Sequence, residues 1–149
     1  MLLDPYTFCI ASAGGFFLVG LLTGVWKYAW IARTATTQAA APPYVDIAHR
    51  ASLMYSFACV LLAHLCARSA WSAALNTAAA IVLVAFFASA VAGYILHGVL
   101  RDTDNQLRIP HRLGGRVIPR GVMRAFMAAL IVGEVGGFIV LLAGFLAAR

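Results

Sequence analysis

The chain alternates long apolar runs with short polar connections. Four of these runs are long enough to cross a bilayer, at about 8–31, 47–67, 71–99 and 121–147. Nearly all of the 149 residues lie in these runs and their connections, which leaves no room for a separate soluble domain. We therefore expect an all-α fold, a four-transmembrane-helix bundle that forms a single integral membrane domain over residues 1–149.

Glycines recur at helical spacing within two of the predicted spans. Gly20 and Gly24 form a G-x-x-x-G pair in the first span, and Gly133 and Gly137 form another in the fourth. Because glycine has no side chain, such pairs let helix backbones approach closely in a membrane. Both pairs therefore predict tight helix contacts, within one subunit or between subunits.

The first connection, residues 33–46, is expected to be irregular through Pro42-Pro43, because residues before proline avoid helix. Asp46 is then a candidate to cap the second span or to favour its N-terminus.

The hydrophobic fraction of 63% and the mean hydropathy of +0.90 agree with a polytopic membrane protein. The net charge of +6 does not point to nucleic acid, because the basic residues follow the loops. Nine flank the first and third connections and two lie on the opposite side. The nine are Lys27, Arg33, Arg50, Arg101, Arg108, Arg112, Arg116, Arg120 and Arg124, and the two are Arg68 and Arg149. The first and third connections are therefore predicted to be cytoplasmic and both termini to lie outside.

The three cysteines, Cys9, Cys59 and Cys66, lie in or at the ends of spans without a C-x-x-C pattern. We interpret them as buried apolar residues, since covalent haem attachment, a zinc knuckle and a disulfide framework have no support.

His49 begins the second span, and a histidine that enters a bilayer is costly unless it has a partner, a cavity or a metal. His64 lies fifteen residues later, roughly 22 Å along a helix, so the two cannot share one metal. Tyr94, His97 and Arg101 share one face of the third span, near its predicted cytoplasmic end. We expect His49, Tyr94 and His97 to surround one cavity at that end.

The third connection is the polar part of the chain. Asp102-x-Asp104 begins like a calcium loop, but the glycine and the glutamate of an EF-hand are missing. Its arginines are typical of contact with anionic membrane lipid, and one or two of them could instead pair with carboxylates of a bound ligand. Glu134 falls near the bilayer midplane, where it is interpreted as a polar tie between helices or as a catalytic acid.

These residues permit haem chemistry. A neutral imidazole such as that of His49 is a good axial ligand for haem iron, and it leaves the sixth position open. The propionates would then face the arginines, with Arg50 and Arg101 as candidate partners. Alternatively, His49 and His97 could hold both faces of the haem, as in a b-type cytochrome subunit that transfers electrons.

Short motifs resemble those of the styrene oxide isomerase family of four-span bacterial membrane enzymes. They are Leu21-Leu22-Thr23-Gly24-Val25, Ala48-His49 and Val91-Ala92-Gly93-Tyr94, followed by a polar loop with an asparagine. The resemblance implies a homotrimer in the bacterial inner membrane, with haem b bound between subunits and His49 as the iron ligand. It further implies that ferric iron acts as a Lewis acid on a small hydrophobic epoxide, which rearranges to a carbonyl compound, and that Tyr94 positions the epoxide oxygen.

The chain also departs from this family. Tyr55 stands where the family has an asparagine, which makes Tyr55 a candidate catalytic residue. At roughly 120° around the helix from His49, Tyr55 would serve the same site only if more than one subunit walls it. The family's aspartate before the tyrosine of the third span is replaced by Phe86 or a neighbour. A glutathione-using four-span trimer and a structural or assembly protein without chemistry remain as further alternatives.

Overall fold

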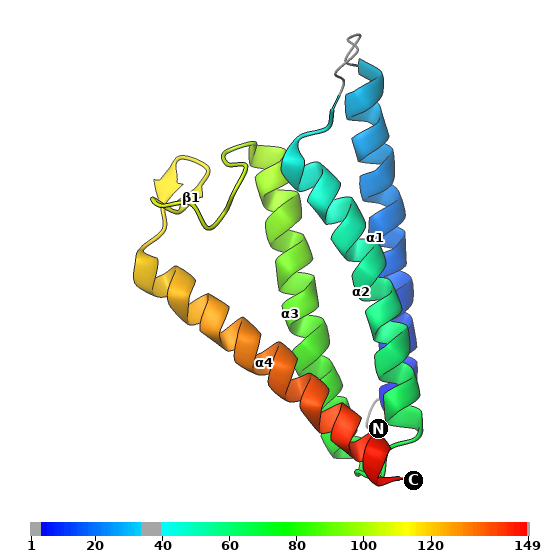
Figure 1. The fold of residues 1–149 in the computed structure, drawn as a ribbon. Helices are drawn as coiled ribbons and strands as arrows, with labels where there is room; N and C mark the ends of the chain where they lie inside the picture. The colour runs from blue at the N-terminus through cyan, green and yellow to red at the C-terminus, as the bar shows by residue number, and fades with distance from the viewer. Residues whose placement is uncertain (1–3, 34–39, 149) are drawn as a thin grey trace.

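The computed structural model describes residues 4–33 and 40–148, and four long helices make up most of it (Figure 1). They are α1 (Pro5–Arg33), α2 (Pro43–Ala67), α3 (Ala73–Leu100) and α4 (Arg120–Ala147). Each helix is long and apolar enough to cross a membrane. The predicted all-α fold of four helices, each long and apolar enough to cross a membrane, is therefore confirmed.

The start of α2 differs from the prediction. The helix begins at Pro43, four residues before the predicted start at 47, with Pro42 at its N-cap. Proline fits the first turn of a helix, because its missing N–H would have no partner there. Asp46 consequently lies inside the first turn and makes no capping hydrogen bond. Its carboxylate instead forms ion pairs with Lys27 of α1 and Arg50 of α2. Of its two predicted roles, the cap was wrong, whereas a negative charge in the first turn of α2 is confirmed.

Glycines set the distance between α1 and α2. A Cβ atom added at Gly20 would lie 2.6 Å from Cδ2 of Leu53, and one added at Gly24 would lie 2.9 Å from Cε1 of His49. Neither position has room for a larger residue unless the Leu53 or His49 side chain, or α2 itself, moves. The close contact predicted from the first G-x-x-x-G pair is confirmed, and it joins helices of the same chain.

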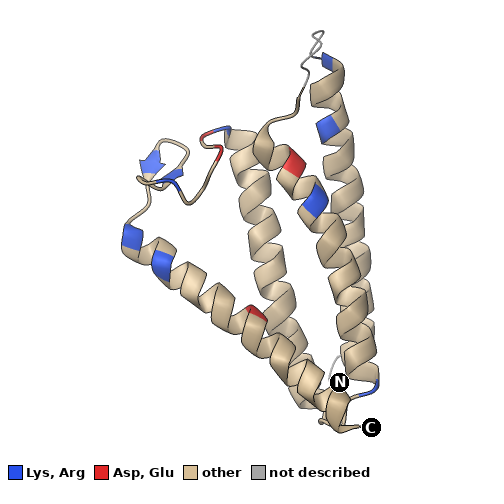
Figure 2. Ribbon diagram, viewed as in Figure 1, with Lys and Arg blue, Asp and Glu red and all other residues tan. Residues whose placement is uncertain are grey.

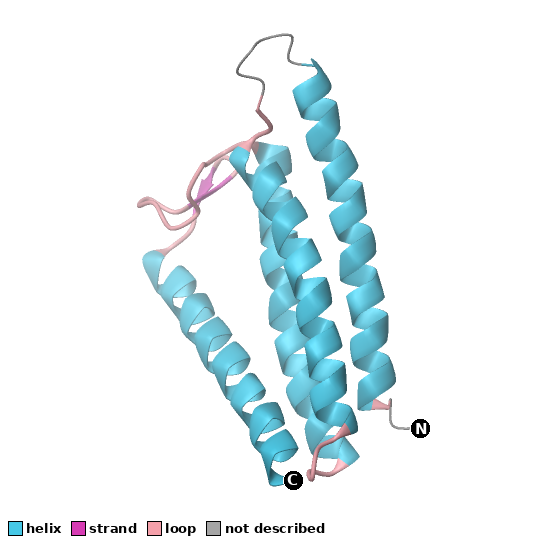
Figure 3. Ribbon diagram, turned by 45° about the vertical axis from the view of Figure 1, so that its right-hand side comes forward, coloured by secondary structure: helices cyan, strands magenta, loops and turns pink. Residues whose placement is uncertain are grey.

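The fourth helix packs on the others mainly through its C-terminal part. A Cβ atom added at Gly133 would collide with the Phe86 ring, and one added at Gly137 would lie 3.1 Å from Cγ of Leu83. Further along, the Trp71 indole donates a hydrogen bond of 2.9 Å to the Val140 carbonyl. Towards its N-terminus, α4 diverges from the bundle (Figures 1 and 3). The second G-x-x-x-G pair therefore holds α4 against α3.

The buried core is formed by α1, α2 and α3 together with one residue of α4. All three cysteines lie in this core as free thiols, which confirms their interpretation as buried apolar residues. Its members are Cys9, Ala13, Phe16, Cys59, Leu62, Ala63, Leu65, Cys66, Ala79, Ala80, Leu83, Phe87, Val91 and Leu141.

The connection from α3 to α4 contains a small hairpin that the sequence pattern did not predict. Strand β1 (Arg112–Leu113) pairs antiparallel with β2 (Arg116–Val117). Gly114 turns the chain with a φ of 59°, a conformation that glycine adopts without steric cost. We call the end of the bundle that carries this connection the loop end. Most charged residues gather there, opposite the two termini (Figure 2).

Candidate functional site

His49 is held against α1 by a hydrogen bond and by close packing. Its Nδ1 lies 2.7 Å from the Gly20 carbonyl oxygen, and its ring contacts the backbone at Gly24. A carbonyl oxygen only accepts, so Nδ1 carries the hydrogen and donates it. The other ring nitrogen, Nε2, therefore keeps its lone pair, which is the state required of a metal ligand.

Arg50 and Arg101, the candidate partners of haem propionates, each contact another side chain of the same chain. The Arg50 guanidinium lies 2.8 Å from the Asp46 carboxylate, and its side chain is 66% exposed. The Arg101 guanidinium lies 5.4 Å from the centre of the Trp30 ring. Both cations lie at the loop end, and the exposure of Arg50 leaves its remaining N–H donors accessible.

His97 forms a buried pair with Asp102. The His97 Nδ1 lies 2.8 Å from the Asp102 carboxylate, and the two side chains are 8% and 6% exposed. His97 belongs to the last turn of α3, and Asp102 is the second residue after the helix ends at Leu100. Because α3 ends there, the chain turns back and brings Asp102 against the ring.

The Asp102 carboxylate also fixes the loop. Its second oxygen accepts a hydrogen bond from the backbone N–H of Gly114 in the hairpin. Burial raises the pKa of the Asp102 carboxyl, but the hydrogen bonds from His97 and Gly114 outweigh burial, so its pKa lies below the usual 3.8. Asp102 is thus a carboxylate at neutral pH and orients the His97 ring.

An apolar pocket of about 290 Å³ lies between α3 and the diverging part of α4. Tyr55 of α2 and Tyr94 and His97 of α3 supply polar groups to it, together with Ser89 and Gln106. We call it the α3–α4 pocket. The rest of its lining is Ala90, Gly93, Leu96, Leu113, Met123, Phe126, Met127 and Leu130. An apolar cavity with a few convergent polar groups is typical of a site for a small hydrophobic molecule.

Tyr44 connects the residues around this pocket. Its ring stacks on Tyr94 with centroids 6.0 Å apart and packs on His97 at 5.0 Å. Its hydroxyl accepts a hydrogen bond from the backbone N–H of Gln106 in the loop. Tyr44 is 4% exposed, so it is a structural support that holds α2, α3 and the loop together.

The structure thus groups some of the predicted site residues and separates others. Tyr55, Tyr94 and His97 line the same pocket, and Tyr55 also stacks on Phe87 at 4.3 Å. His49 is not among the residues that line the pocket, because its ring faces α1. Within one chain, His49 and His97 therefore make contacts with different helices. His64 lies exposed near Tyr6, at the other end of α2 from His49.

Glu134 lies in a shallow apolar groove between α3 and α4. The groove is lined by Leu83, Phe87, Val135, Phe138 and Ile139 besides Glu134 itself. Its buried Oε1 atom has no hydrogen-bond partner among residues 4–33 and 40–148. This oxygen accordingly does not form the polar tie between helices that the sequence suggested.

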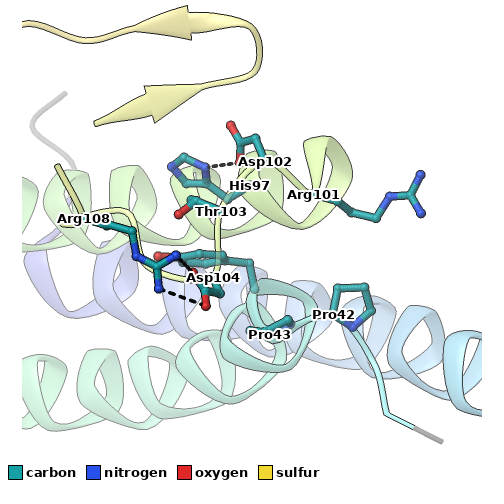
Figure 4. Close-up of a pocket in the computed structure, with 9 residues that line it drawn as sticks. Pro42, Pro43, His97, Arg101, Asp102, Thr103, Asp104 and Arg108 are labelled. Atoms are coloured by element: carbon teal, nitrogen blue, oxygen red, sulfur yellow. Dashed lines mark hydrogen bonds and ion pairs between the residues drawn. The ribbon is translucent and has the colours of Figure 1, made fainter. Parts of the chain in front are cut away.

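A second, more polar cavity of about 380 Å³ opens at the loop end, and we call it the loop cavity (Figure 4). Arg101 points away from the other side chains drawn there, while Arg108 pairs with Asp104 at 2.9 Å. The lining comprises Pro42, Pro43, Tyr44, His97, Arg101, Asp102, Thr103, Asp104 and Arg108. His97 is the residue that this lining shares with the α3–α4 pocket.

Sequence reasoning missed three of these contacts: that of Gly20 with His49, that of Asp102 with His97, and that of Tyr44 with Tyr94 and His97. A signal for the second was present, because a histidine in the last turn of a helix and an aspartate five residues later come together when the chain reverses. The Gly20 carbonyl carries no comparable signal, since every residue has one.

No family model, curated protein or solved structure matches this chain. In the part of the chain that the structure describes, no group of three or more His, Cys, Asp or Glu residues could hold a metal ion. The assignment of a function therefore depends on the geometry around His49 and the α3–α4 pocket.

Proposed function

We propose that this chain is a haem b-dependent membrane isomerase, which converts a small hydrophobic epoxide into a carbonyl compound. The observation that carries the proposal is the state of His49. The Gly20 carbonyl fixes its Nδ1–H, and two glycines pack against the helix turn that presents it. Metal-binding histidines are commonly oriented in this way, by a carbonyl that accepts from the nitrogen not bound to the metal.

His49 supports the proposal of a haem, because its Nε2 atom keeps a lone pair. One imidazole is sufficient, because the porphyrin supplies four further nitrogens. His49 would hold the iron, and Arg50 and Arg101 would pair with the propionates, since both guanidinium groups lie at the loop end. When bound, a ferric haem supplies a Lewis acid that can polarise an epoxide oxygen.

The α3–α4 pocket suits the substrate. Its walls are apolar, and its volume of about 290 Å³ limits it to a small molecule. Exclusion of water protects the cationic carbon that forms when the epoxide ring opens, which would otherwise be hydrolysed to a diol. Tyr55, which stacks on Phe87, also lines the pocket, and an aromatic ring close to the substrate stabilises a developing positive charge.

Tyr94 supplies the hydrogen bond to the oxygen. Its ring is stacked on Tyr44, which fixes the direction of the phenol group. As the C–O bond breaks, negative charge grows on the oxygen, and a donor that is already in place stabilises this charge more than that of the intact epoxide. Tyr94 therefore accelerates ring opening without a change in its own position.

The proposal also requires more than one subunit. His49 faces α1 while the pocket lies between α3 and α4, so a site that uses both needs side chains from neighbouring copies. The homotrimer implied by the family resemblance is one assembly that provides them.

The proposed activity is tested by incubating purified protein in detergent with aryl and terpenoid epoxides and analysing the products by gas chromatography. We expect an aldehyde or ketone of the same mass as the epoxide, without any added reductant or oxidant. A diol, or no conversion by haem-loaded protein, would contradict the proposal. If Tyr94→Phe forms the product at the same rate as the original protein, Tyr94 has no part in the mechanism, but the proposed reaction stands.

A further inference from the structure

His97 lies between a membrane-embedded pocket and a polar cavity. It lines both the α3–α4 pocket and the loop cavity. The first is walled mostly by aliphatic and aromatic side chains of α3 and α4, whereas the second is lined by arginines, aspartates and a threonine. A side chain that borders both can exchange a proton with a molecule bound on one side and with water on the other.

The state of the ring suits this exchange. The Asp102 carboxylate accepts the Nδ1–H of His97, so the neutral ring presents an unprotonated Nε2. Figure 4 shows this second nitrogen on the side of the ring turned away from Asp102. A buried carboxylate behind the ring also stabilises the imidazolium that forms when Nε2 takes a proton, as an orienting aspartate does in hydrolases.

The other groups near His97 do not replace Asp102 in this role. Tyr44 of α2 contacts the ring face, and its hydroxyl is occupied by the Gln106 N–H. Arg108 and Asp104 of the loop neutralise one another at 2.9 Å, and Arg101 is engaged with Trp30. Tyr94 of α3 stacks on the same Tyr44 ring, with centroids 6.0 Å apart, and carries no charge at neutral pH. Asp102 is thus the charged group in direct contact with the imidazole.

We propose that His97 is the catalytic acid–base group of the α3–α4 pocket and that Asp102 is its positioning residue. This inference rests on the proposed epoxide isomerisation. When the C–O bond breaks, its electron pair goes to the oxygen, which Tyr94 holds. The carbon that keeps the oxygen then loses a proton to Nε2, and its C–H electron pair becomes the C=C bond of an enolate.

The second half of the reaction returns a proton to the other carbon. A lone pair of the enolate oxygen forms the C=O bond, and the C=C pair takes a proton from the imidazolium to form a C–H bond. Atoms and charge balance, because one proton leaves the substrate and one returns. Between the two steps, the proton on Nε2 exchanges with water in the loop cavity. The product therefore carries a solvent hydrogen on the carbon next to the carbonyl group.

The isomerisation run in D₂O tests this directly. The alternative route, a 1,2-hydride shift, moves hydrogen between carbons without exchange and gives an unlabelled product. Samples are taken at early times and reduced with borohydride, which stops later exchange of the carbonyl product. We expect one deuterium per product molecule with the unaltered protein, and turnover about 10²-fold lower with His97→Gln. Asp102→Asn should lower the rate as well, and it should alter the pH profile because Asn cannot stabilise the imidazolium.

His64→Gln is the matched control, because His64 lies exposed near Tyr6 at the opposite end of α2. It should retain both turnover and labelling. Conversion to an unlabelled product would overturn the role of His97 and leave the isomerase proposal intact. Absence of conversion by haem-loaded protein would overturn the isomerase proposal instead. A measurement that needs no turnover would then test whether the Nε2 atom of His97 is accessible from water.

Acylation by diethyl pyrocarbonate provides that measurement. This reagent attacks the unprotonated imidazole nitrogen, so it should modify His97, which borders the loop cavity, despite the ring's burial. Addition of 2-phenylethanol, an apolar molecule for the α3–α4 pocket, should slow the modification of His97 and not that of His64. Peptide mapping that finds His64 modified and His97 untouched would contradict access to Nε2 from water.

Discussion

The His49 imidazole donates its Nδ1–H to the Gly20 carbonyl across the α1–α2 contact, at 2.7 Å. This single bond determines the tautomer of the ring and thereby which nitrogen remains available. The position of the ring also explains the glycine at position 24, since the ring lies where a side chain of α1 would otherwise be. At position 20 it is the Leu53 side chain that takes this space.

The first prediction concerns the space beside this ring. Gly24→Ala places a Cβ atom 2.9 Å from His49 Cε1, which is too close for the present geometry. We expect the ring to shift, with a loss of about 1–3 kcal/mol in the free energy of unfolding and weaker haem retention. Thermal unfolding in detergent and the haem-to-protein absorbance ratio measure the two effects.

Gly14→Ala is the control for that substitution. Gly14 lies in the same helix, and an added Cβ atom there would meet no heavy atom within 4 Å. Alanine favours helix over glycine by about 1 kcal/mol, so this variant should be as stable as the original protein or more so. Equal destabilisation by both alanines would show that the contact with His49 does not matter.

A second prediction concerns the attachment of α4. An added Cβ atom at Gly133 collides with the Phe86 ring, whereas at Gly136 it meets nothing within 4 Å. Gly133→Ala should therefore loosen α4 and lower the unfolding temperature, because the overpacked contact costs about 1–3 kcal/mol. Gly136→Ala should not lower it. Proteolysis within the loop between α3 and α4 gives an independent measure of loosening.

The sequence predicted the four helices because each span contains more than twenty mostly apolar residues. It also predicted the two glycine contacts, since G-x-x-x-G spacing directly reflects close backbone approach. The start of α2 was placed four residues late, because Pro42-Pro43 was interpreted as a barrier rather than as a first turn. The hairpin was missed because two-residue strands leave no periodic signal.

The sequence predicted several residues of the candidate site but not how they are arranged. Tyr94 and His97 share a helix face by spacing alone, and both line the α3–α4 pocket. That His49 faces α1 instead depends on the rotation of α2, which is set by tertiary contacts such as those of Leu53 with Gly20. The pairing of His97 with Asp102 depends on where α3 ends and on the path of the loop. Neither is encoded in a local pattern.

A third prediction concerns Tyr94. Removal of its hydroxyl in Tyr94→Phe deletes a hydrogen-bond donor for the developing oxyanion and leaves the stacked ring in place. We expect kcat for epoxide isomerisation to fall about 10²- to 10³-fold, with an unchanged haem spectrum. Tyr28→Phe, at an exposed position of α1, should have no effect. A lower KM with unchanged kcat would contradict the assigned role.

A fourth prediction follows from the lowered pKa of Asp102. A carboxyl whose pKa is lower in the folded state stabilises the fold above its unfolded pKa, here near 3.8, and this contribution is lost as pH falls through the folded value. The unfolding temperature should therefore decrease below about pH 4. Asp102→Asn should be less stable at neutral pH, and its difference from the original protein should shrink on acidification. A difference that stays constant with pH would contradict the prediction.

The absorption spectrum of the purified protein tests the central assignment most directly. We predict a Soret band that is lost in His49→Ala and retained in His64→Gln, together with a high-spin ferric spectrum that epoxide analogues perturb. Folding of the alanine variant is checked by circular dichroism and gel filtration. A colourless protein, or a Soret band that survives in folded His49→Ala, would contradict the account. A low-spin spectrum that His97→Ala converts to high spin would instead indicate a paired-histidine cytochrome.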